Sequence, residues 1–406
     1  MPFVIFVAPY YTEFNVRAIE ATAALGDVRV AVISQEPWEA LPAQARSKAV
    51  AHWRVDDALS SVQLLAAARA LASAQGAIFR IFAGNEQVQV PVAEVRERLS
   101  IDGMRVAAAQ NFRDKARMKD VLRAAGLPCA RHHVAADVSA ALAFAAEVGY
   151  PLVLKPPAGA ASQATYRADG ADALHSAMTA MQPSSTNPVL LEEFITGNEH
   201  SFDTFSLEGR PVFHSLTRYL PQPLDVVRNP WIQWRVILPR EIEVPRYDDI
   251  RQAAFLALDA LGMTTGISHL EWFRRADGSI AISEVAARPP GAQIMTLIAR
   301  ANDFDALAAW CRLMVFGQFD PPARRYAVGA AYLRGQGQGT VRAIHGLAEA
   351  EREIGPMVTD VKLPAIGDRA SPSYEGEGFI IVRHPETVVV EQALARIVET
   401  VRVELG

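Results

Sequence analysis

Long apolar runs are absent from this sequence of 406 residues. No uninterrupted apolar stretch reaches the roughly 18 residues that a membrane-spanning helix requires. The first residues, MPFVIFVAPYY, lack the charged segment that opens a secretory leader and lead directly into a strand-like pattern. We therefore expect a cytoplasmic protein that has no membrane partner.

Cysteine is also scarce, and basic residues are not in excess over acidic ones. Cys129 and Cys311 are the two cysteines, and because they show no CxxC spacing, a structural disulfide or a zinc site is not expected. Acidic residues outnumber Lys and Arg by 45 to 40, which leaves a formal net charge of −5. Nucleic-acid-binding proteins normally carry a basic excess, so we expect no nucleic-acid partner.

The N-terminal part of the chain alternates strand and helix patterns. The strand-like runs FVIFVA, VRVAVIS and AIFRIF are separated by Ala-rich helical stretches, which is typical of a parallel α/β layer. From Asn111 a helix, RDKARMKDVLRAAG, is closed by Gly126 and Pro128, and a second helix and the strand PLVLK follow. A second lobe is therefore expected, since a chain of this length exceeds one ordinary core.

The remaining sequence predicts two β-hairpins, which turn at Glu208-Gly209 and at Asp277-Gly278. Between them, the Pro-rich segment of residues 221–245 predicts a long irregular loop near the site. From about Ala323 the chain has the strand patterns YAVGAAYLRG and GFIIVRH, and TVVVEQALARIVETVRVEL predicts one final helix.

Two acids in the second hairpin are the first candidates for chemistry. Glu271 precedes Asp277 by six residues and Glu284 follows Gly278 by six, so they should lie side by side on facing strands. Adjacent carboxylates repel each other unless a positive group joins them, and a hard divalent ion such as Mg²⁺ is the usual solution. The alternative is a pair of solvated acids on an edge hairpin.

Two lysines could meet a phosphate near such an ion. Lys115 begins a helix, and Lys155 ends the strand YPLVLK before the small-residue loop PPAGAASQAT, although a lysine there could also extend to solvent. Arg288 follows Glu284 by four residues, immediately before Pro289-Pro290-Gly291, where the chain must turn. A strand end is a rigid mount for a carboxylate and a guanidinium together.

Four stretches in order resemble the ATP-grasp ligases: RDKARMKDVLRAAGLP, YPLVLKPPAGAAS, LLEEFITGNE and HLEWFRRADGSIAISEVAARPPG. The resemblance is closest to the L-amino-acid ligases and carnosine-synthase-like enzymes, which join a carboxylate to an amine. It implies an α/β protein with the ATP-grasp fold and four parts. These are a Rossmann-like N-terminal domain (1–110), a small lobe (111–200), a large lobe (201–322) and a C-terminal α/β lobe completing the large lobe (323–406).

The resemblance also implies roles for individual residues. Lys115 and Lys155 would contact the ATP phosphates beneath a loop containing Ser162, and Glu199 would hold the ribose. Glu192 would approach the adenine amino group, with the backbone at Phe194 and Ile195 binding the ring. Glu271 and Glu284 would bind Mg²⁺, as two ions that Mn²⁺ could replace. Arg288, Lys155 and Glu284 would form the catalytic set.

The sequence departs from the family pattern at two points. Many members have asparagine two residues after the second acid, where this chain has Ala286, so water or a phosphate oxygen would supply that ligand. The phosphate loop reads SQAT where a glycine is frequent after the serine.

Several further residues are candidates for a substrate pocket: His269, Trp231, Arg235 and Gly291. His269 lies two residues before Glu271 on the same strand face, where a satisfied core histidine is equally expected. Trp231 and Trp234 could shape the pocket or simply pack beneath a loop.

The predicted function is an ATP-dependent ligase that joins small amino-acid-type substrates through an acyl phosphate and releases ADP and phosphate. Two alternatives share the fold or part of it. One is a purine-biosynthesis-type or biotin-carboxylase-like enzyme, although the Arg-rich run of biotin carboxylases is not found after the adenine hinge. The other is a non-catalytic nucleotide-binding module. A homodimer is the expected assembly, as the commonest closed symmetric one.

Overall fold

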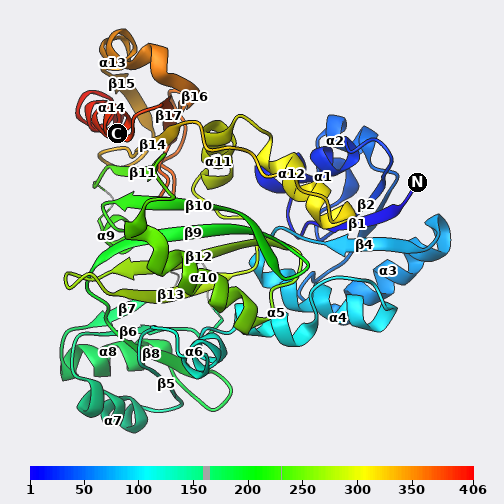
Figure 1. Ribbon diagram of the computed structural model, residues 1–406, viewed down its shortest axis with the longest axis horizontal. Helices are drawn as coiled ribbons and strands as arrows, with labels where there is room; N and C mark the ends of the chain where they lie inside the picture. The colour runs from blue at the N-terminus through cyan, green and yellow to red at the C-terminus, as the bar shows by residue number, and fades with distance from the viewer. Residues whose placement is uncertain (159–164, 230) are drawn as a thin grey trace.

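The computed structural model describes residues 1–158, 165–229 and 231–406. Its N-terminal part is a four-stranded sheet of order β3-β2-β1-β4 in which every pairing is parallel (Figure 1). This confirms the parallel α/β layer expected from the apolar strand runs. The strands are β1 (Phe3–Val7), β2 (Arg29–Ser34), β3 (Ala51–Arg54) and β4 (Ile78–Phe82), and the main helices are α1 (Glu13–Ala23), α2 (Ala43–Lys48), α3 (Ser61–Gln75) and α4 (Gln89–Leu99).

Two helices lead from this sheet into a small antiparallel one of order β5-β8-β6-β7. Asp114 caps the second of them, because its carboxylate accepts hydrogen bonds from the Ala116 and Arg117 amides. Lys115 therefore stands at a fixed helix start. The elements are α5 (Val106–Arg113), α6 (Lys115–Ala124), β5 (His132–Ala135), α7 (Val138–Val148), β6 (Leu152–Lys155), β7 (Tyr166–Ala168), α8 (Ala171–Met181) and β8 (Val189–Glu193).

An eight-stranded antiparallel sheet of order β13-β12-β9-β10-β11-β14-β17-β16 forms the centre of the molecule (Figure 1). Both predicted hairpins belong to it, and three of the strands after residue 323, β14, β16 and β17, extend the same sheet. The strands are β9 (Asn198–Leu207), β10 (Arg210–Leu220), β11 (Trp234–Leu238), β12 (Gly266–Arg274), β13 (Ile280–Ala286), β14 (Ala327–Leu333), β16 (Val358–Lys362) and β17 (Gly378–His384).

Five longer helices and a small sheet complete the chain. In Figure 1 the C-terminal pair β15–β18 lies with α13 and α14 at one end of the central sheet, and α11 and α12 lead toward the N-terminal domain. In the described ranges, no helix has both the length and the apolar character to cross a membrane. The bounds are α10 (Asp248–Leu261), α11 (Ile294–Asn302), α12 (Ala306–Phe316), β15 (Val341–His345), α13 (Leu347–Ile354), α14 (Thr387–Thr400) and β18 (Arg402–Leu405).

Two predictions of local structure were wrong. Residues 221–245 are not one irregular loop, because they contain the short helix α9 (Pro223–Arg228) and the strand β11. The run WRVIL is buried between β10 and β14, which favours a strand despite the surrounding prolines. The last helix ends at Thr400, since Val401 and Val403 are buried and the alternating sequence that follows forms β18.

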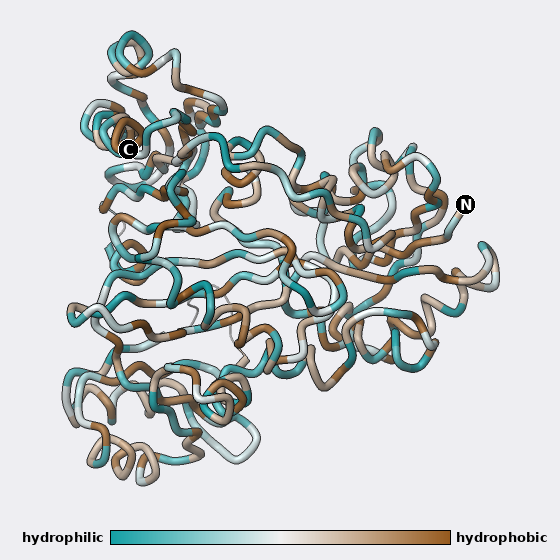
Figure 2. The backbone as a smooth tube through the Cα atoms, viewed as in Figure 1, coloured by the Kyte–Doolittle hydropathy of each residue, from teal (hydrophilic) through white to brown (hydrophobic). Residues whose placement is uncertain are grey.

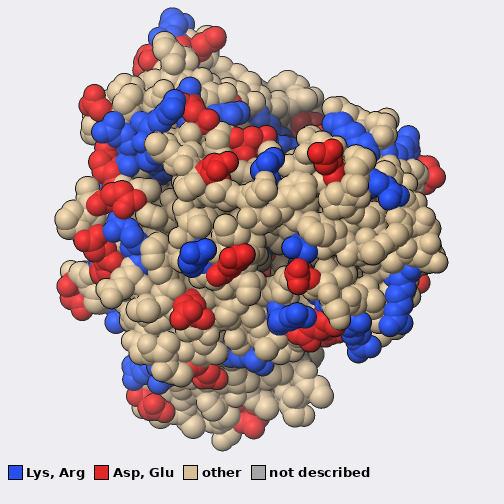
Figure 3. Space-filling model, turned by 45° about the vertical axis from the view of Figure 1, so that its right-hand side comes forward, with Lys and Arg blue, Asp and Glu red and all other residues tan. Residues whose placement is uncertain are grey.

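A core of aromatic side chains joins the N-terminal domain to the central sheet. Trp310 on α12 contacts Phe82 of β4 edge-on, with ring centroids 5.6 Å apart, and also packs on Phe14 of α1. Figure 2 shows apolar segments running through the interior of both parts. On the face drawn in Figure 3, basic and acidic side chains are interspersed. The two parts are therefore held together mainly by buried apolar surface.

Trp310→Ala should lower the free energy of unfolding by about 3–5 kcal/mol, because it removes a fully buried indole and leaves a cavity. Trp310 is 1% exposed, whereas Trp231 is 64% exposed. The matched control Trp231→Ala should change stability by no more than about 0.5 kcal/mol. Urea unfolding followed by circular dichroism measures both, and equal effects of the two substitutions would contradict the packing role of Trp310.

Candidate active site

Glu271 and Glu284 are direct partners across the β12–β13 pairing, as their equal distances from the turn predict. The register shifts immediately after Glu271, so the pair stands at an irregularity in the ladder. Directly opposed residues of an antiparallel pair have Cβ atoms about 5 Å apart, so their carboxylates share one small volume. Two negative charges in that volume require positive neighbours.

Each of these acids has its own positive partner. Glu284 Oε1 lies 2.8 Å from Lys115 Nζ, and Glu271 Oε1 lies 3.5 Å from His269 Nε2. Burial acts to raise the pKa of Glu271, but the hydrogen bond and charge of His269 outweigh it and hold the pKa at about 2. Glu271 is therefore ionised at neutral pH.

His269 is buried with its hydrogen bonds satisfied, and it also lines a cavity. Both interpretations offered by the sequence, a core histidine and a pocket residue, therefore apply. His269 Nδ1 lies 2.6 Å from Asp203 Oδ1, a fully buried carboxylate that also accepts a hydrogen bond from Ser201. Burial acts to lower the pKa of His269, but Asp203 and Glu271 raise it to about 9. Asp203 was not found from the sequence, where it appears only as one polar residue of the alternating strand HSFDTF.

A second buried charge network lies beside the first. Glu192 Oε2 is 3.0 Å from Lys155 Nζ, and Glu192 Oε1 is 3.2 Å from Lys119 Nζ. Lys119 is fully buried and donates a further hydrogen bond of 2.6 Å to the Ser283 carbonyl, next to Glu284. Each oxygen of the Glu192 carboxylate therefore has a buried lysine as its partner.

The lysines of this network differ in their electrostatics. Burial lowers the pKa of Lys119, which Glu192 only partly offsets. Burial acts in the same direction on Lys155, but the charges of Glu192 and Glu284 outweigh it and the pKa is raised. Lys119 was missed from the sequence, although its place four residues after Lys115 puts both lysines on one face of α6.

A narrow cavity of about 130 Å³ collects most of the predicted nucleotide-binding residues. Burial raises the pKa of Glu199 well above its usual value, and the charge of Glu271 raises it further. Ser162 lies outside the described residues. The predicted residues that line this cavity are Lys115, Lys155, Glu192, Phe194, Ile195, Glu199, Glu271 and Glu284.

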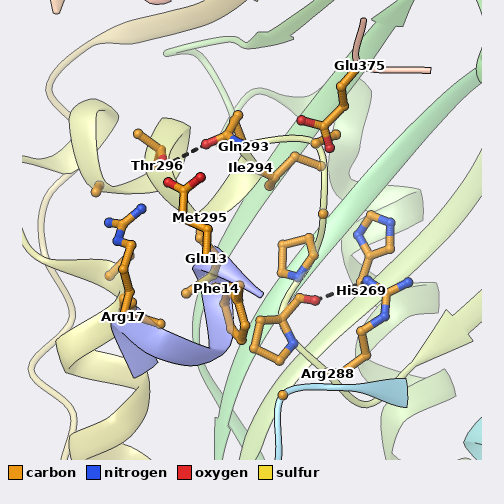
Figure 4. A pocket seen from close by; sticks show the side chains of 18 of the residues that line it. Glu13, Phe14, Arg17, His269, Arg288, Gln293, Ile294, Met295, Thr296 and Glu375 are labelled. Atoms are coloured by element: carbon orange, nitrogen blue, oxygen red, sulfur yellow. Dashed lines mark hydrogen bonds between the residues drawn. The ribbon is translucent and has the colours of Figure 1, made fainter. Parts of the chain in front are cut away.

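A second, much larger cavity of about 1210 Å³ opens on the other side of the acid pair. It is walled by α1, the segment after β4, the beginning of α11 and the segment before β17 (Figure 4). Glu271 and Glu284 line both cavities. A group bound in the narrow cavity would therefore meet a group bound in the large one at these two carboxylates.

Arg288 lines the large cavity beside His269 (Figure 4). Its Nε lies 3.3 Å from Glu86 Oε2, and its Nη1 donates to the Pro289 carbonyl. Glu86, buried in the N-terminal domain, also lies 3.2 Å from Arg113 Nη1. The partner of Arg288 is thus Glu86 and not Glu284. Glu86 was missed because AGNEQ, the stretch after β4, carries no distinguishing pattern.

The predicted pocket residues divide into two groups. Gly291 and His269 line the large cavity, as does Trp234, which is buried and donates from its indole N–H to the Pro221 carbonyl. Trp231 and Arg235 do not belong to either cavity wall. The correction follows from β11: Trp234 faces the cavity, so Arg235 points to the opposite face of the strand.

Comparison with known proteins identifies the nucleotide-binding part. The family described as ATP-grasp domain matches residues 148–297. This part of the chain is therefore similar to an ATP-grasp domain. An L-amino acid ligase from Bacillus licheniformis superimposes with a TM-score of 0.79 over 100% of this chain and 99% of that one, at 19% identity.

Two curated relatives from Bacillus subtilis are also ligases by name. The L-arginine-specific L-amino acid ligase is 26% identical over 50% of this chain and 50% of its own length. The alanine–anticapsin ligase is 26% identical over 59% of this chain and 54% of its own length. The chain thus spans about half the length of these two relatives, whose names describe amino-acid ligases.

The Glu192 network has a testable energetic consequence. Glu192→Gln should lower the free energy of unfolding by about 3–5 kcal/mol, because it leaves Lys119 and Lys155 buried without their counter-charge. Glu193→Gln, which removes the partly exposed partner of Arg131, should cost about 1 kcal/mol or less. Urea unfolding at neutral pH compares the two, and similar small losses would contradict the network's role.

The same network predicts a pH dependence. The lysine charges depress the pKa of Glu192 to about 2, below its value in the unfolded chain. The ionised Glu192 carboxylate therefore contributes its full stabilisation at pH values above the pKa that Glu192 has in the unfolded chain. This stabilisation is lost as the pH falls toward 2. The difference in stability between wild type and Glu192→Gln should shrink over that acidic interval.

Proposed function

We propose that this protein is an ATP-dependent carboxylate–amine ligase that joins small amino-acid-type substrates and releases ADP and phosphate. The observation that carries the proposal is the acid pair Glu271–Glu284, which lines a narrow cavity with lysines on one side and a large cavity with Arg288 on the other. The ATP-grasp domain and the ligase relatives support the same reading. A nucleotide and a carboxylate substrate would meet at that pair.

The donor set at this junction fits Mg²⁺. Glu271 and Glu284 provide hard oxygen ligands, and a cation there would offset the repulsion that raises the pKa of Glu199. In the described part of the chain, no group of three or more His, Cys, Asp or Glu side chains has a metal-binding arrangement. Phosphate oxygens and water would therefore complete the coordination, including the place that Ala286 leaves. The bound ion would neutralise charge on the transferring phosphoryl group.

The basic residues would position the reactants. Lys115 and Lys155 would bind the phosphates, exchanging their present contacts with Glu284 and Glu192 for phosphate oxygens. A substrate carboxylate held near Arg288 would attack the γ-phosphorus, the bond to ADP would break, and an acyl phosphate would form. The amine of the second substrate would then attack the acyl carbon, lose a proton and expel phosphate.

Arg288 would act on the charge that develops in both steps. Its planar guanidinium can donate two parallel hydrogen bonds to phosphoryl or acyl oxygens, which a lysine cannot do. The ion pair with Glu86 and the hydrogen bond to Pro289 fix its orientation in advance.

The products of turnover test the reaction class. With ATP, Mg²⁺ and a panel of amino acids tested singly and in pairs, active combinations should release one ADP and one phosphate for each amide formed. Chromatography of the nucleotides with phosphate detection and mass spectrometry of the products provides the measurement. Stoichiometric AMP and pyrophosphate would refute γ-phosphoryl transfer, and absence of ADP release from every pair would refute the ligase assignment.

Arg288→Lys tests the role of the guanidinium. If Arg288 stabilises the acyl phosphate and the oxyanion, kcat should fall about 10²–10³-fold, as for an oxyanion-hole donor. Calorimetric ATP affinity and the unfolding midpoint should stay nearly unchanged, since Arg288 does not line the nucleotide cavity. If its role were only the ion pair with Glu86, lysine would retain most of the rate, so a variant with a third or more of wild-type kcat contradicts the assignment.

A further inference from the structure

Seven acidic residues line the large cavity, and most have a fixed partner. Glu13 pairs with Lys362, Glu86 with Arg113 and Arg288, Glu271 with His269, Glu284 with Lys115, and Asp303 with Arg325 and Arg383. Asp305 caps α12 by accepting from the Ala308 amide. Glu375, in the same wall, forms no ion pair with a basic residue in the described part of the chain. Like Asp305, it therefore has no basic partner among the described residues.

Glu375 is held in place from two sides. Tyr374, the preceding residue, packs edge-on against Trp234 with ring centroids 5.3 Å apart. The Gln293 side chain and the Ala292 backbone both act to lower the pKa of the Glu375 carboxylate. Figure 4 shows it directed toward the Gln293–Ile294 corner of the cavity. Its position is thus set by contacts that leave its negative charge unneutralised.

The backbone near Glu375, at Ala292 and Gln293, has an unusual conformation. Ala292 and Gln293 both have left-handed conformations, with φ of 50° and 55°, and the Ile294 amide closes the turn on the Gly291 carbonyl at 2.9 Å. Left-handed non-glycine residues cost free energy and persist where surrounding contacts hold them. This turn offers the Ala292 N–H to Glu375, which ties the acid to the segment that follows Arg288.

The surroundings of Glu375 suit a cation. Burial raises its pKa, an effect that a bound positive charge would reverse. The rings of Tyr219 and Tyr374 line the same cavity, and the faces of such rings attract ammonium and guanidinium groups. Trp234 supports this wall, because its buried ring is stacked on Tyr219 and Tyr332. Among charged residues, Lys362 and Glu13 act most strongly on Glu375, and these two form an ion pair between β16 and α1, away from the acid pair.

We propose that Glu375 binds a cationic side-chain group, an ammonium or a guanidinium, carried by one of the substrates. This inference rests on the proposed ligase function and gives it a substrate class, basic amino acids. The reacting carboxylate would lie at Arg288, and the cationic end of the side chain would extend along the aromatic wall to Glu375. The large volume of the cavity accommodates such a long side chain.

Pairs of substrates that differ in charge but not in shape provide the test. Lysine and norleucine form one pair, and arginine and citrulline form the other, each offered with a panel of second amino acids. Wild type should prefer the cationic member in kcat/KM, and Glu375→Gln should lower kcat/KM for that member by about 10- to 100-fold, as for a lost charge-assisted hydrogen bond. The neutral members should change less than about twofold.

Glu351→Gln on α13 is the matched control, since it removes the same charge from an exposed position outside both cavities. It should leave the preference for cationic substrates intact. Titration calorimetry with lysine and with arginine adds a readout that does not need turnover, and affinity should fall only in Glu375→Gln. Equal unfolding midpoints of both variants would show that the effect is not one of folding.

The outcomes separate the two proposals. Equal use of cationic and neutral substrates by wild type, with no effect of Glu375→Gln, overturns the cation site while ADP release still supports the ligase. Cation binding that depends on Glu375, without ADP release from any pair, refutes the ligase and retains the site. Loss of binding to the neutral members as well would show that Glu375 only supports the cavity wall, which also overturns the inference.

Discussion

The opposition of Glu271 and Glu284 on neighbouring strands is the constraint around which the rest of the site is organised. Two carboxylates at directly opposed positions repel each other, so positive groups must converge on them. Lys115 from α6 and His269 from β12 do so, and His269 is in turn held by Asp203 on β9. Because these groups come from separate elements, the pair links the small lobe to the central sheet.

Further ion pairs surround the acid pair. Glu192 brings Lys119 and Lys155 together, and Lys119 reaches the carbonyl beside Glu284, so the two networks share one wall. Arg288 is oriented by Glu86 from the N-terminal domain, and this domain also packs on Trp310 of α12 through Phe82 and Phe14. Side chains from separate parts of the chain thus pair at the site, as Glu86 does with Arg288. Glu375 departs from this pattern, because within residues 1–158, 165–229 and 231–406 its carboxylate forms no ion pair with a basic residue.

Sequence reasoning succeeded where the relevant geometry is local. The equal spacing of Glu271 and Glu284 about Asp277-Gly278 predicted their pairing correctly. The pairs nearer the turn, such as Trp272 with Ile282, are offset by one residue, and the register shift after Glu271 restores the opposition of the two acids. Sequence reasoning failed where composition and local pattern disagreed. The prolines of residues 221–245 suggested a loop, yet WRVIL is a short apolar run that a central strand can bury. The final helix was extended too far because its periodicity changes only in the last four residues.

By itself, the sequence determined the parallel N-terminal layer, both hairpins, the acid pair and the order of the ATP-grasp motifs, because each depends on residues close together in the chain. Only the tertiary structure decided which distant residues complete the site. Asp203 meets His269 because β9 is the neighbour of β12, Glu86 meets Arg288 across 202 positions, and Glu375 reaches the cavity from the segment before β17. Strand order and lobe packing determine these contacts, and they arise from the sum of many weak apolar contacts that no short motif records.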